Sequence, residues 1–174
     1  YPKWMNAMDA VNQGAAVVMT SVGKARELGI DPAKWVFLHG CGEANEKILV
    51  SERVDYHSSP AMAANTSSAF EMAGKRIDDM DYIDIYSCFP SAVEIGCDEL
   101  GLRYDDPRGL TVTGGLPFFG GPGNNYSMHA IATMLPLLRA APSKFGLVTA
   151  NGGYLSKHAT GIYSATATKG RWRR

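Results

Sequence analysis

The sequence has little of three features that would each assign it to a defined class of protein. It has only three cysteines, Cys41, Cys88 and Cys97, and no C-x-x-C spacing, so it indicates neither a disulfide framework nor a zinc ribbon. Its 17 basic residues balance its 17 acidic residues, which leaves no charge excess to attract nucleic acid or an anionic membrane. No apolar run approaches the roughly 18 residues that span a bilayer. We therefore expect no nucleic-acid partner, no membrane contact, no metal site, and a reducing, cytoplasmic compartment.

The length fits one domain, or one half of a larger two-domain enzyme. The chain has 174 residues, of which 45% are hydrophobic and 20% charged, as in ordinary globular proteins. It begins without an initiator Met or a signal sequence and ends in a basic cluster. We interpret it as a piece of a longer protein, with one domain over residues 1–168. Residues 169–174 would be a basic linker or the start of a further segment.

The order of apolar segments predicts an α/β fold. Alternating or continuous apolar runs indicate strands, and apolar residues at spacings of three and four indicate helices. Strands are expected at residues 14–20, 35–38, 82–86, 145–150 and 161–167, the last two paired as neighbours. Helices are expected at residues 21–28, 61–73, 91–100 and 124–138, with Ser21 as an N-cap and Gly29 and Gly101 as terminators. Residues 39–42 are expected to form a loop, and the state of residues 46–54 stays open.

Cys88 is the best single candidate for a reactive group. It lies between a predicted strand and a predicted helix, and a helix N-terminus lowers the pKa of a nearby thiol. The alternative is that Cys88 is a small buried hydrophobic residue, as most free cysteines are. Cys41 and Cys97 are expected to be structural. His39 and Cys41 form a single His-x-Cys pair, which offers too few ligands for zinc.

A second candidate site lies in the Gly- and Pro-rich segment at residues 114–123. Gly120, Gly121 and Gly123 would let a ligand approach the backbone closely, and Asn124 and Asn125 follow at the start of a helix. The segment matches neither of the glycine motifs that bind nucleotides. We therefore expect a cradle for an oxyanion or a phosphate group rather than a nucleotide site.

His129 follows Asn125 by four residues, so both would lie on one helical face within reach of a shared site. The alternative for His129 is a surface histidine with no chemical role. His57 and His158 have no partner that the sequence identifies.

The order of these segments resembles the C-terminal half of the thiolase superfamily, particularly the sterol-carrier-protein thiolases and related thiolase-like proteins. Residues 13–18 (QGAAVV) resemble the (D)GAAA strand that opens that half. Residues 86–89 (YSCF), with Glu94 and residues 99–102 (ELGL), resemble the HDCF segment and its LGL helix. Residues 114–115 and 120–123 resemble the GG…GHP-G loop, and residues 149–153 (TANGG) fall at the C-x-G motif. The resemblance spans nearly the whole chain.

The resemblance implies a fold, a substrate and partners. The fold is an αβα layered domain with a five-stranded mixed sheet and helices on both faces. The activity is acyl transfer on acyl-CoA or β-ketoacyl-CoA thioesters, with coenzyme A thioester as substrate and no permanently bound cofactor. The partners are acyl-CoA and the N-terminal thiolase half, which carries the nucleophilic cysteine and would supply a homodimer interface.

The same resemblance implies roles for the candidate residues. Cys88 would be the acid/base, as the cysteine of HDCF is in sterol-carrier-type thiolases, and Asn125 and His129 would donate to an oxyanion. Gly120, Gly121, Gly123 and Asn124 would contact the thioester.

Several departures from the family pattern put catalysis by this chain in doubt. Gly121 stands in place of the GHP histidine, and Thr149 or Ala150 replaces the C-x-G cysteine. Tyr86 and Ser87 replace the His and Asp of HDCF. Because the resemblance assigns the nucleophilic cysteine to the N-terminal half, the chain alone is expected to be inactive.

Three hypotheses follow. The chain is the C-terminal half of a thiolase-like acetyl-CoA acetyltransferase; or a thiolase-fold protein that binds acyl-CoA or a partner enzyme without catalysis; or an unrelated doubly wound domain. Since fold does not by itself establish chemistry, the ionisation of Cys88 and its position relative to the Gly-rich loop separate the first two hypotheses.

Overall fold

A mixed sheet of four strands forms the centre of the molecule in the computed structural model, which describes residues 2–168. The strands are β1 (Phe37–Asn45), β2 (Tyr82–Asp84), β3 (Gly146–Gly152) and β4 (Lys157–Ser164), in the order β1-β4-β3-β2. β4 is antiparallel to both β1 and β3, whereas β2 runs parallel to β3. The predicted pairing of the last two strands is confirmed.

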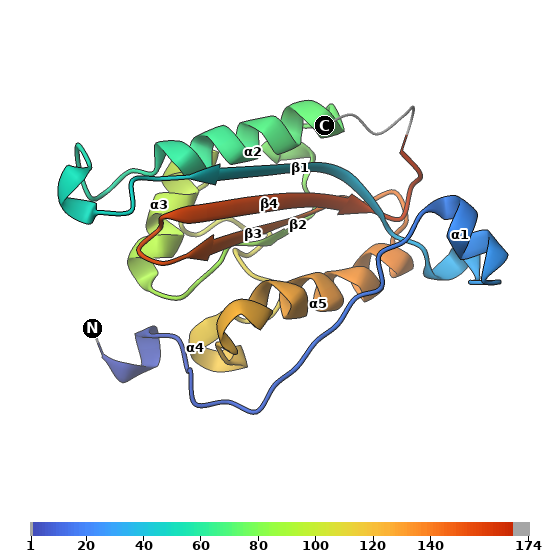
Figure 1. Ribbon diagram of the computed structural model, residues 1–174, viewed down its shortest axis with the longest axis horizontal. Coiled ribbons are helices and arrows are strands. Elements are labelled where there is room, and N and C mark those ends of the chain that lie inside the picture. The colour runs from blue at the N-terminus through green and yellow to red at the C-terminus, as the bar shows by residue number, and fades with distance from the viewer. Residues whose placement is uncertain (1, 169–174) are drawn as a thin grey trace.

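Helices cover both faces of the sheet (Figure 1). α2 (Pro60–Ala73) and α3 (Pro90–Leu100) lie on one face, and α4 (Leu116–Phe119) and α5 (Tyr126–Ala140) on the other. α1 (Val22–Glu27) lies beyond one end of the sheet. Short 3-10 turns complete the chain at Lys3–Met5, Pro32–Lys34, Val50–Glu52, Ile77–Asp79 and Gly123–Asn125. The predicted αβα layering is confirmed.

Each face of the sheet has its own apolar core. Met62 of α2, Cys97 of α3 and Ile162 of β4 belong to one buried cluster, and Tyr126 and Met134 of α5 belong to the other. Since successive residues of a strand point to opposite faces, Leu147 of β3 joins the first cluster and Val148 joins the second. The central strands β3 and β4 therefore have buried residues on both faces of the sheet.

Capping residues mark the starts of α1 and α2 and the ends of α2 and α3. Ser21 accepts a hydrogen bond from the Lys24 amide at the start of α1, and Ser59 accepts one from the Met62 amide at the start of α2. Gly74 and Gly101 adopt left-handed conformations, with φ of 59° and 67°, immediately after α2 and α3.

Five strands were expected, but residues 2–168 contribute four. The missing strand is residues 14–20, which form an extended segment without a partner strand. Val18 is 87% exposed and Met19 is 78% exposed, so this apolar run is not buried. Apolar composition predicts burial, but a strand also requires a neighbour whose backbone it can bond, and no described segment supplies one here.

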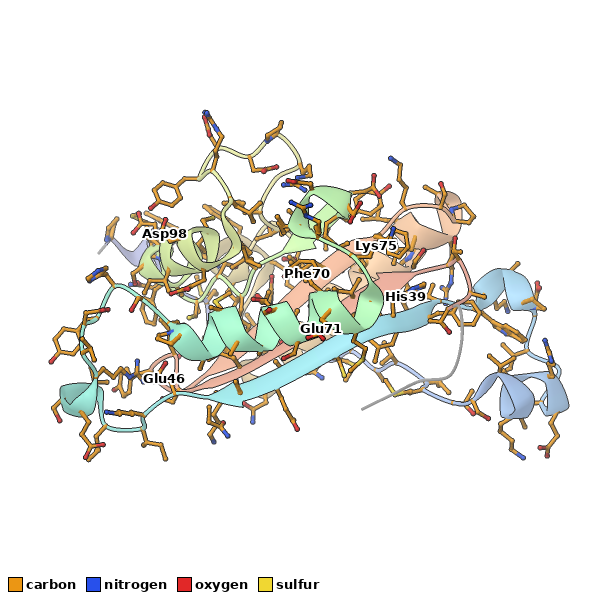
Figure 2. The ribbon with its side chains drawn as sticks, turned by 90° about the horizontal axis from the view of Figure 1, so that it is seen from above. His39, Glu46, Phe70, Glu71, Lys75 and Asp98 are labelled. Atoms are coloured by element: carbon orange, nitrogen blue, oxygen red, sulfur yellow. The ribbon has the colours of Figure 1, made fainter. Side chains whose placement is uncertain are left out.

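The loop expected at residues 39–42 is also wrong, because β1 continues through them to Asn45. α2 lies along β1 and β4 (Figure 2), and Gly40 and Gly42 permit this contact. A Cβ atom on Gly40 would collide with the carbonyl oxygen of Ala69, and one on Gly42 with that of Asn65. These glycines allow a helix to approach the strand closely, whereas sequence reasoning took them for turn residues.

Among residues 2–168, no helix has the length and apolar content needed to cross a bilayer. The predicted boundary at residue 168 and the basic segment at residues 169–174 lie outside the described residues.

Candidate functional site

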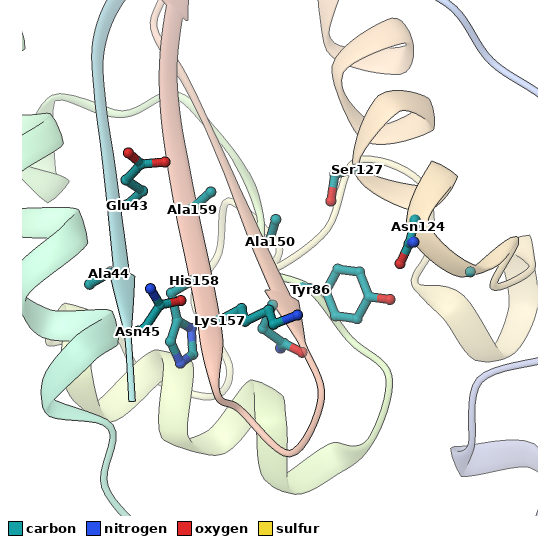
Figure 3. Close-up of a pocket in the computed structure, with 12 residues that line it drawn as sticks. Glu43, Ala44, Asn45, Tyr86, Asn124, Ser127, Ala150, Lys157, His158 and Ala159 are labelled. Atoms are coloured by element: carbon teal, nitrogen blue, oxygen red, sulfur yellow. The ribbon is translucent and has the colours of Figure 1, made fainter. Parts of the chain in front are cut away.

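A pocket of about 420 Å³ lies between the sheet and the N-terminal end of α5 (Figure 3). Its floor is built from Ala150 of β3 and Ala159 of β4, which are paired directly across the two strands. Ala150 has the same strand parity as Val148, so both alanines face α5. Because these side chains end at a methyl group, they leave open space where larger side chains would fill it.

The walls of the pocket are polar. Asn45 of β1 is paired with Lys157 of β4, and Glu43 of β1 with Ala159, so these residues flank the floor on the same face of the sheet. Asn124 and Ser127, from the first turn of α5 and the residues before it, form the opposite wall. Tyr86, two residues after β2, closes the side between sheet and helix.

Tyr86 is fixed in place by its backbone and its ring. Its amide donates a 3.0 Å hydrogen bond to Oγ1 of Thr149, and its ring meets Tyr126 edge-on with centroids 5.3 Å apart. Burial raises the pKa of the Tyr86 hydroxyl, with a further contribution from Cys88. The hydroxyl is therefore a proton donor at neutral pH.

Cys88 lies beside the pocket and does not line it. Its Sγ is 3.9 Å from Oδ1 of Asn151, and Asn151 itself lines the pocket. Cys88 precedes α3 by two residues, as predicted, but burial raises the pKa of its thiol and outweighs the hydrogen bonds to the Cys88 and Phe89 amides and to Asn151, which lower it. The expected low-pKa thiol is therefore corrected: the desolvation cost exceeds the effect of the helix N-terminus.

Asn125 and His129 lie on the side of α5 that meets the N-terminal segment. The Asn125 side chain makes two hydrogen bonds with the backbone of Ala15, of 2.8 and 3.0 Å. His129 meets the ring of Phe119 edge-on at 5.3 Å, and its Nε2 is buried without a hydrogen-bond partner among the described residues. The structure brings both residues to one region, as the spacing predicts, but neither lines the pocket.

The Gly-rich loop divides between two environments. Gly120, with φ of 115°, packs against the Gln13 side chain, and Gly121 packs against Ala7. Gly123 and Asn124 line the pocket. Of the predicted cradle, Gly120 and Gly121 are thus covered by the N-terminal segment, and only Gly123 and Asn124 face the pocket.

Sequence reasoning missed a buried network beneath the loop. Asp84, at the end of β2, accepts hydrogen bonds from the Val112 amide at 2.9 Å and the Tyr126 hydroxyl at 3.1 Å. Thr113 Oγ1 lies 2.6 Å from the Tyr126 hydroxyl. Burial raises the pKa of Asp84 to about 6. The only signal in the sequence is an acidic residue within an apolar strand.

The remaining histidines have partners that the sequence did not identify. His158 is buried in β4 with Nε2 3.1 Å from Oγ of Ser59, and burial lowers its pKa. His39 meets the Phe145 ring edge-on at 5.0 Å, and burial lowers its pKa too. Within residues 2–168, no three His, Cys, Asp or Glu side chains are grouped as metal ligands.

Comparison with known proteins identifies relatives over most of this chain. It is 30% identical over 145 residues to an acetyl-CoA acetyltransferase of Schizosaccharomyces pombe and 29% identical over 144 residues to one of Syntrophomonas wolfei. The matches cover 82% and 83% of this chain but 34% of each relative. The chain thus spans about a third of the length of these relatives. No family model matches the sequence.

A solved structure gives the same result. A monomeric SCP2-thiolase like protein type 1 from Mycobacterium smegmatis superposes with a TM-score of 0.80 and 51% sequence identity. The match covers 85% of this chain and 33% of that protein. The chain belongs to the thiolase superfamily and corresponds to a C-terminal domain of that fold. Its similarity is to thiolase-like proteins of the SCP2 type and to acetyl-CoA acetyltransferases.

Proposed function

We propose that this chain forms the acyl-thioester-binding half of a thiolase-like acetyl-CoA acetyltransferase, with a coenzyme A thioester as substrate. The observation that carries the proposal is the composition of the pocket. Tyr86, Ala150 with Asn151, and Gly123 with Asn124 all line it. By the family resemblance, Tyr86 belongs to the HDCF segment, Ala150 and Asn151 to the C-x-G motif, and Gly123 and Asn124 to the end of the GHP loop and the residue after it. These three segments are distant in sequence and meet at one pocket.

The proposed roles follow from each position. Gly123 and Asn124 would contact the thioester, and Gly120 and Gly121 would shape the loop that presents them. Cys88 would act as an acid through its protonated thiol, linked to the pocket by Asn151. Asn125 and His129 would position the loop and its covering segment.

Acyl transfer also needs a nucleophile, which this chain does not supply. We propose that an N-terminal thiolase half provides it, that this half is the main partner and carries any homodimer interface, and that the chain alone is inactive. We also keep a cytoplasmic location as part of the proposal.

A second candidate function is binding of acyl-CoA, or of a partner enzyme, without catalysis. The observation that favours it is the raised pKa of Cys88, together with Gly121 where the family has a basic histidine. With few thiolates near neutral pH and no adjacent base, the pocket would hold a thioester without turning it over.

Intact-mass measurement of the full-length protein after incubation with acetyl-CoA or acetoacetyl-CoA tests the two functions. A mapped acetyl adduct on a cysteine outside this chain supports the transferase, and loss of turnover in Cys88→Ala assigns the acid to Cys88. Turnover that survives Cys88→Ala removes that role.

Binding of the CoA thioester without any adduct supports the second function. Ala159→Leu, which fills the pocket floor, should abolish binding in either case. Unchanged binding by Ala159→Leu would refute this pocket as the site.

A further inference from the structure

A chain of hydrogen bonds runs from the Gly-rich segment to a buried carboxylate. The Gly115 amide donates to Oγ1 of Thr113 at 3.0 Å, and this oxygen lies 2.6 Å from the hydroxyl of Tyr126. The Tyr126 hydroxyl donates its single proton to Oδ1 of Asp84 at 3.1 Å, so the proton between the two hydroxyls belongs to Thr113. These four residues form the Asp84 relay, in which every hydrogen bond is donated toward the carboxylate.

The second oxygen of Asp84 also meets donors only. Oδ2 accepts from the amides of Val112 at 2.9 Å and Thr113 at 3.4 Å. This set of donors suits an ionised acid, which can only accept. Burial opposes ionisation and is the larger effect, so the pKa is raised to about 6. The ionised and protonated forms therefore differ little in free energy near neutral pH.

The pKa of Asp84 responds to burial and hydrogen bonds and not to a neighbouring charge. Within residues 2–168, no salt bridge joins Asp84 to a basic side chain. The nearest histidine along α5 from Tyr126 is His129, which packs against Phe119. The other titratable side chains of the apolar cluster around Tyr126 come from β2, the residues after it and β4. They are Tyr82, Tyr86, Cys88 and Tyr163.

Tyr126 connects the relay to the pocket. Its ring meets that of Tyr86 edge-on at 5.3 Å, and Tyr86 lines the pocket. Tyr126 is also the first residue of α5, and its near neighbours in sequence, Asn124 and Ser127, form the opposite wall. Figure 3 shows Tyr86, Asn124 and Ser127 around one space. A change in the relay therefore acts on both walls of the pocket.

Protonation of Asp84 disrupts the relay. The amides of Val112 and Thr113 cannot accept the new proton, so the Tyr126 oxygen is the partner that can. The Tyr126 proton must then turn to Thr113, whose own hydroxyl proton loses its acceptor. The hydrogen bonds that support Thr113 and the Gly115 amide are weakened as a result.

We propose that Asp84 is a positioning residue that makes the pocket sensitive to pH. In its ionised form it holds Tyr126, and through it Tyr86 and the Gly-rich segment, in the arrangement that binds a ligand. This inference rests on the proposed binding of a CoA thioester and assigns the regulation of that site. Affinity for the thioester should fall as the pH drops through about 6.

Isothermal titration calorimetry of acetyl-CoA with the full-length protein from pH 5 to pH 8 tests the proposal. Asp84→Asn resembles the protonated acid, and comparison with it cancels the titration of the acetyl-CoA phosphates. The parent should bind about tenfold more tightly than Asp84→Asn at pH 8, which corresponds to one hydrogen bond to a charged group, and about equally at pH 5. Tyr126→Phe, which keeps the ring, should behave as Asp84→Asn does. Glu71→Gln, which removes an exposed carboxylate of α2, should behave as the parent does.

Proton release on binding distinguishes this role from a purely structural one. If binding favours the ionised acid, then at pH 6 the parent should release up to about half a proton more than Asp84→Asn. Titrations in two buffers with different enthalpies of ionisation measure this number.

The outcomes separate this inference from the proposed function. If acetyl-CoA binds at no pH, or if Ala159→Leu leaves its binding unchanged, the proposed function fails and this inference fails with it. If acetyl-CoA binds the parent and Asp84→Asn with the same pH dependence and the same proton release, the inference is overturned while the proposed function stands. Weaker binding by Asp84→Asn to an equal extent at every pH would show that Asp84 only supports the fold, and that also overturns the inference.

Discussion

At Cys88, two opposing effects act on one thiol. Its position just before α3 favours the thiolate, and its burial next to the apolar cluster of α5 disfavours it. Burial is the larger effect, so the pKa of the thiol lies above its ordinary value. The sequence correctly predicted that Cys88 lies just before a helix, but it predicted the wrong direction for the shift of its pKa.

Cys88 should be a slow nucleophile at neutral pH. Because the pKa of this thiol is raised, a smaller fraction of it is ionised at pH 7 than of an ordinary cysteine, so alkylation by iodoacetamide should be slower than that of glutathione. The rate should still be rising about tenfold per pH unit at the pH where the rate for glutathione levels off. Peptide mapping by mass spectrometry, with Cys88→Ser to assign the signal, measures this rate. A rate that levels off below pH 8 would contradict the burial argument.

Asp84 should make stability depend on pH between about 4 and 6. Its pKa is raised to about 6 in the folded protein, so the folded state binds a proton more tightly than the unfolded chain does. The resulting stabilisation is complete below pH 4 and is lost as the pH rises through 6. The loss is about 3 kcal/mol for a shift of this size.

Chemical denaturation of the full-length protein across this pH range, compared with Asp84→Asn, measures the contribution. In Asp84→Asn, the free energy of unfolding should not fall by this amount as the pH rises from 4 to 6. Glu71→Gln, which removes an exposed carboxylate of α2, should keep it. If Asp84→Asn and the parent protein have the same slope, Asp84 titrates normally.

At the scale of elements, β1 and α2 show what glycine does in a strand. Residues 39–42 contain two glycines, a pattern that is equally typical of a turn and of a strand pressed against another backbone. α2 was predicted within one residue of its start because its start signal, Pro60, is local. The close contact of β1 with α2 is not local, and the glycines of β1 do not by themselves distinguish it from a turn.

Gly40→Ala should separate α2 from β1. The new Cβ would overlap the backbone oxygen of Ala69, which cannot move without bending α2. We expect a loss of about 3 kcal/mol in the free energy of unfolding, measured by denaturation. Gly14→Ala is the matched control, since nothing lies within 4 Å of its added Cβ, and its cost should stay below about 0.5 kcal/mol. Similar effects of the two substitutions would refute the close-contact role.

At the scale of the whole molecule, the N-terminal segment closes over the Gly-rich loop. The Ala7 amide donates to the Cys88 carbonyl, and the Gly121 amide donates to the Met8 carbonyl. Gln13 donates to the Phe119 carbonyl at 2.7 Å. These bonds join residues about 80 to 110 positions apart, so the loop is shaped by a segment from the other end of the chain.

Asn125→Ala should release this segment. The Asn125 side chain makes both of its hydrogen bonds with Ala15, at residues 110 positions apart. Their loss should raise hydrogen exchange at residues 9–20 by about tenfold, and leave the strands of the sheet unchanged. Exchange measured by mass spectrometry tests this, with Asn12→Ala, an exposed residue of the same segment, as control. Equal exchange in the two variants would show that Asn125 does not anchor the segment.

The sequence by itself determined the α/β class, the helices α1, α2, α3 and α5, and the antiparallel pair β3 and β4. These features depend on periodicity, capping residues and turns, which act over a few neighbouring positions. The segments that resemble the family motifs also include the residues after β2, before α5 and at the end of β3 that line the pocket.

Tertiary structure alone decided which residues line that pocket and which do not. Strand pairing places Lys157, Glu43 and Asn45 at the pocket. Cys88 instead lies beside Asn151 and outside the pocket, and Asn125 bonds to the backbone of Ala15. Tertiary structure also decided that residues 14–20 form no strand, because no described strand lies beside them and Val18 and Met19 stay exposed. Strand register, burial and the raised pKa of Asp84 all arise from contacts between distant positions, and no local pattern encodes such contacts.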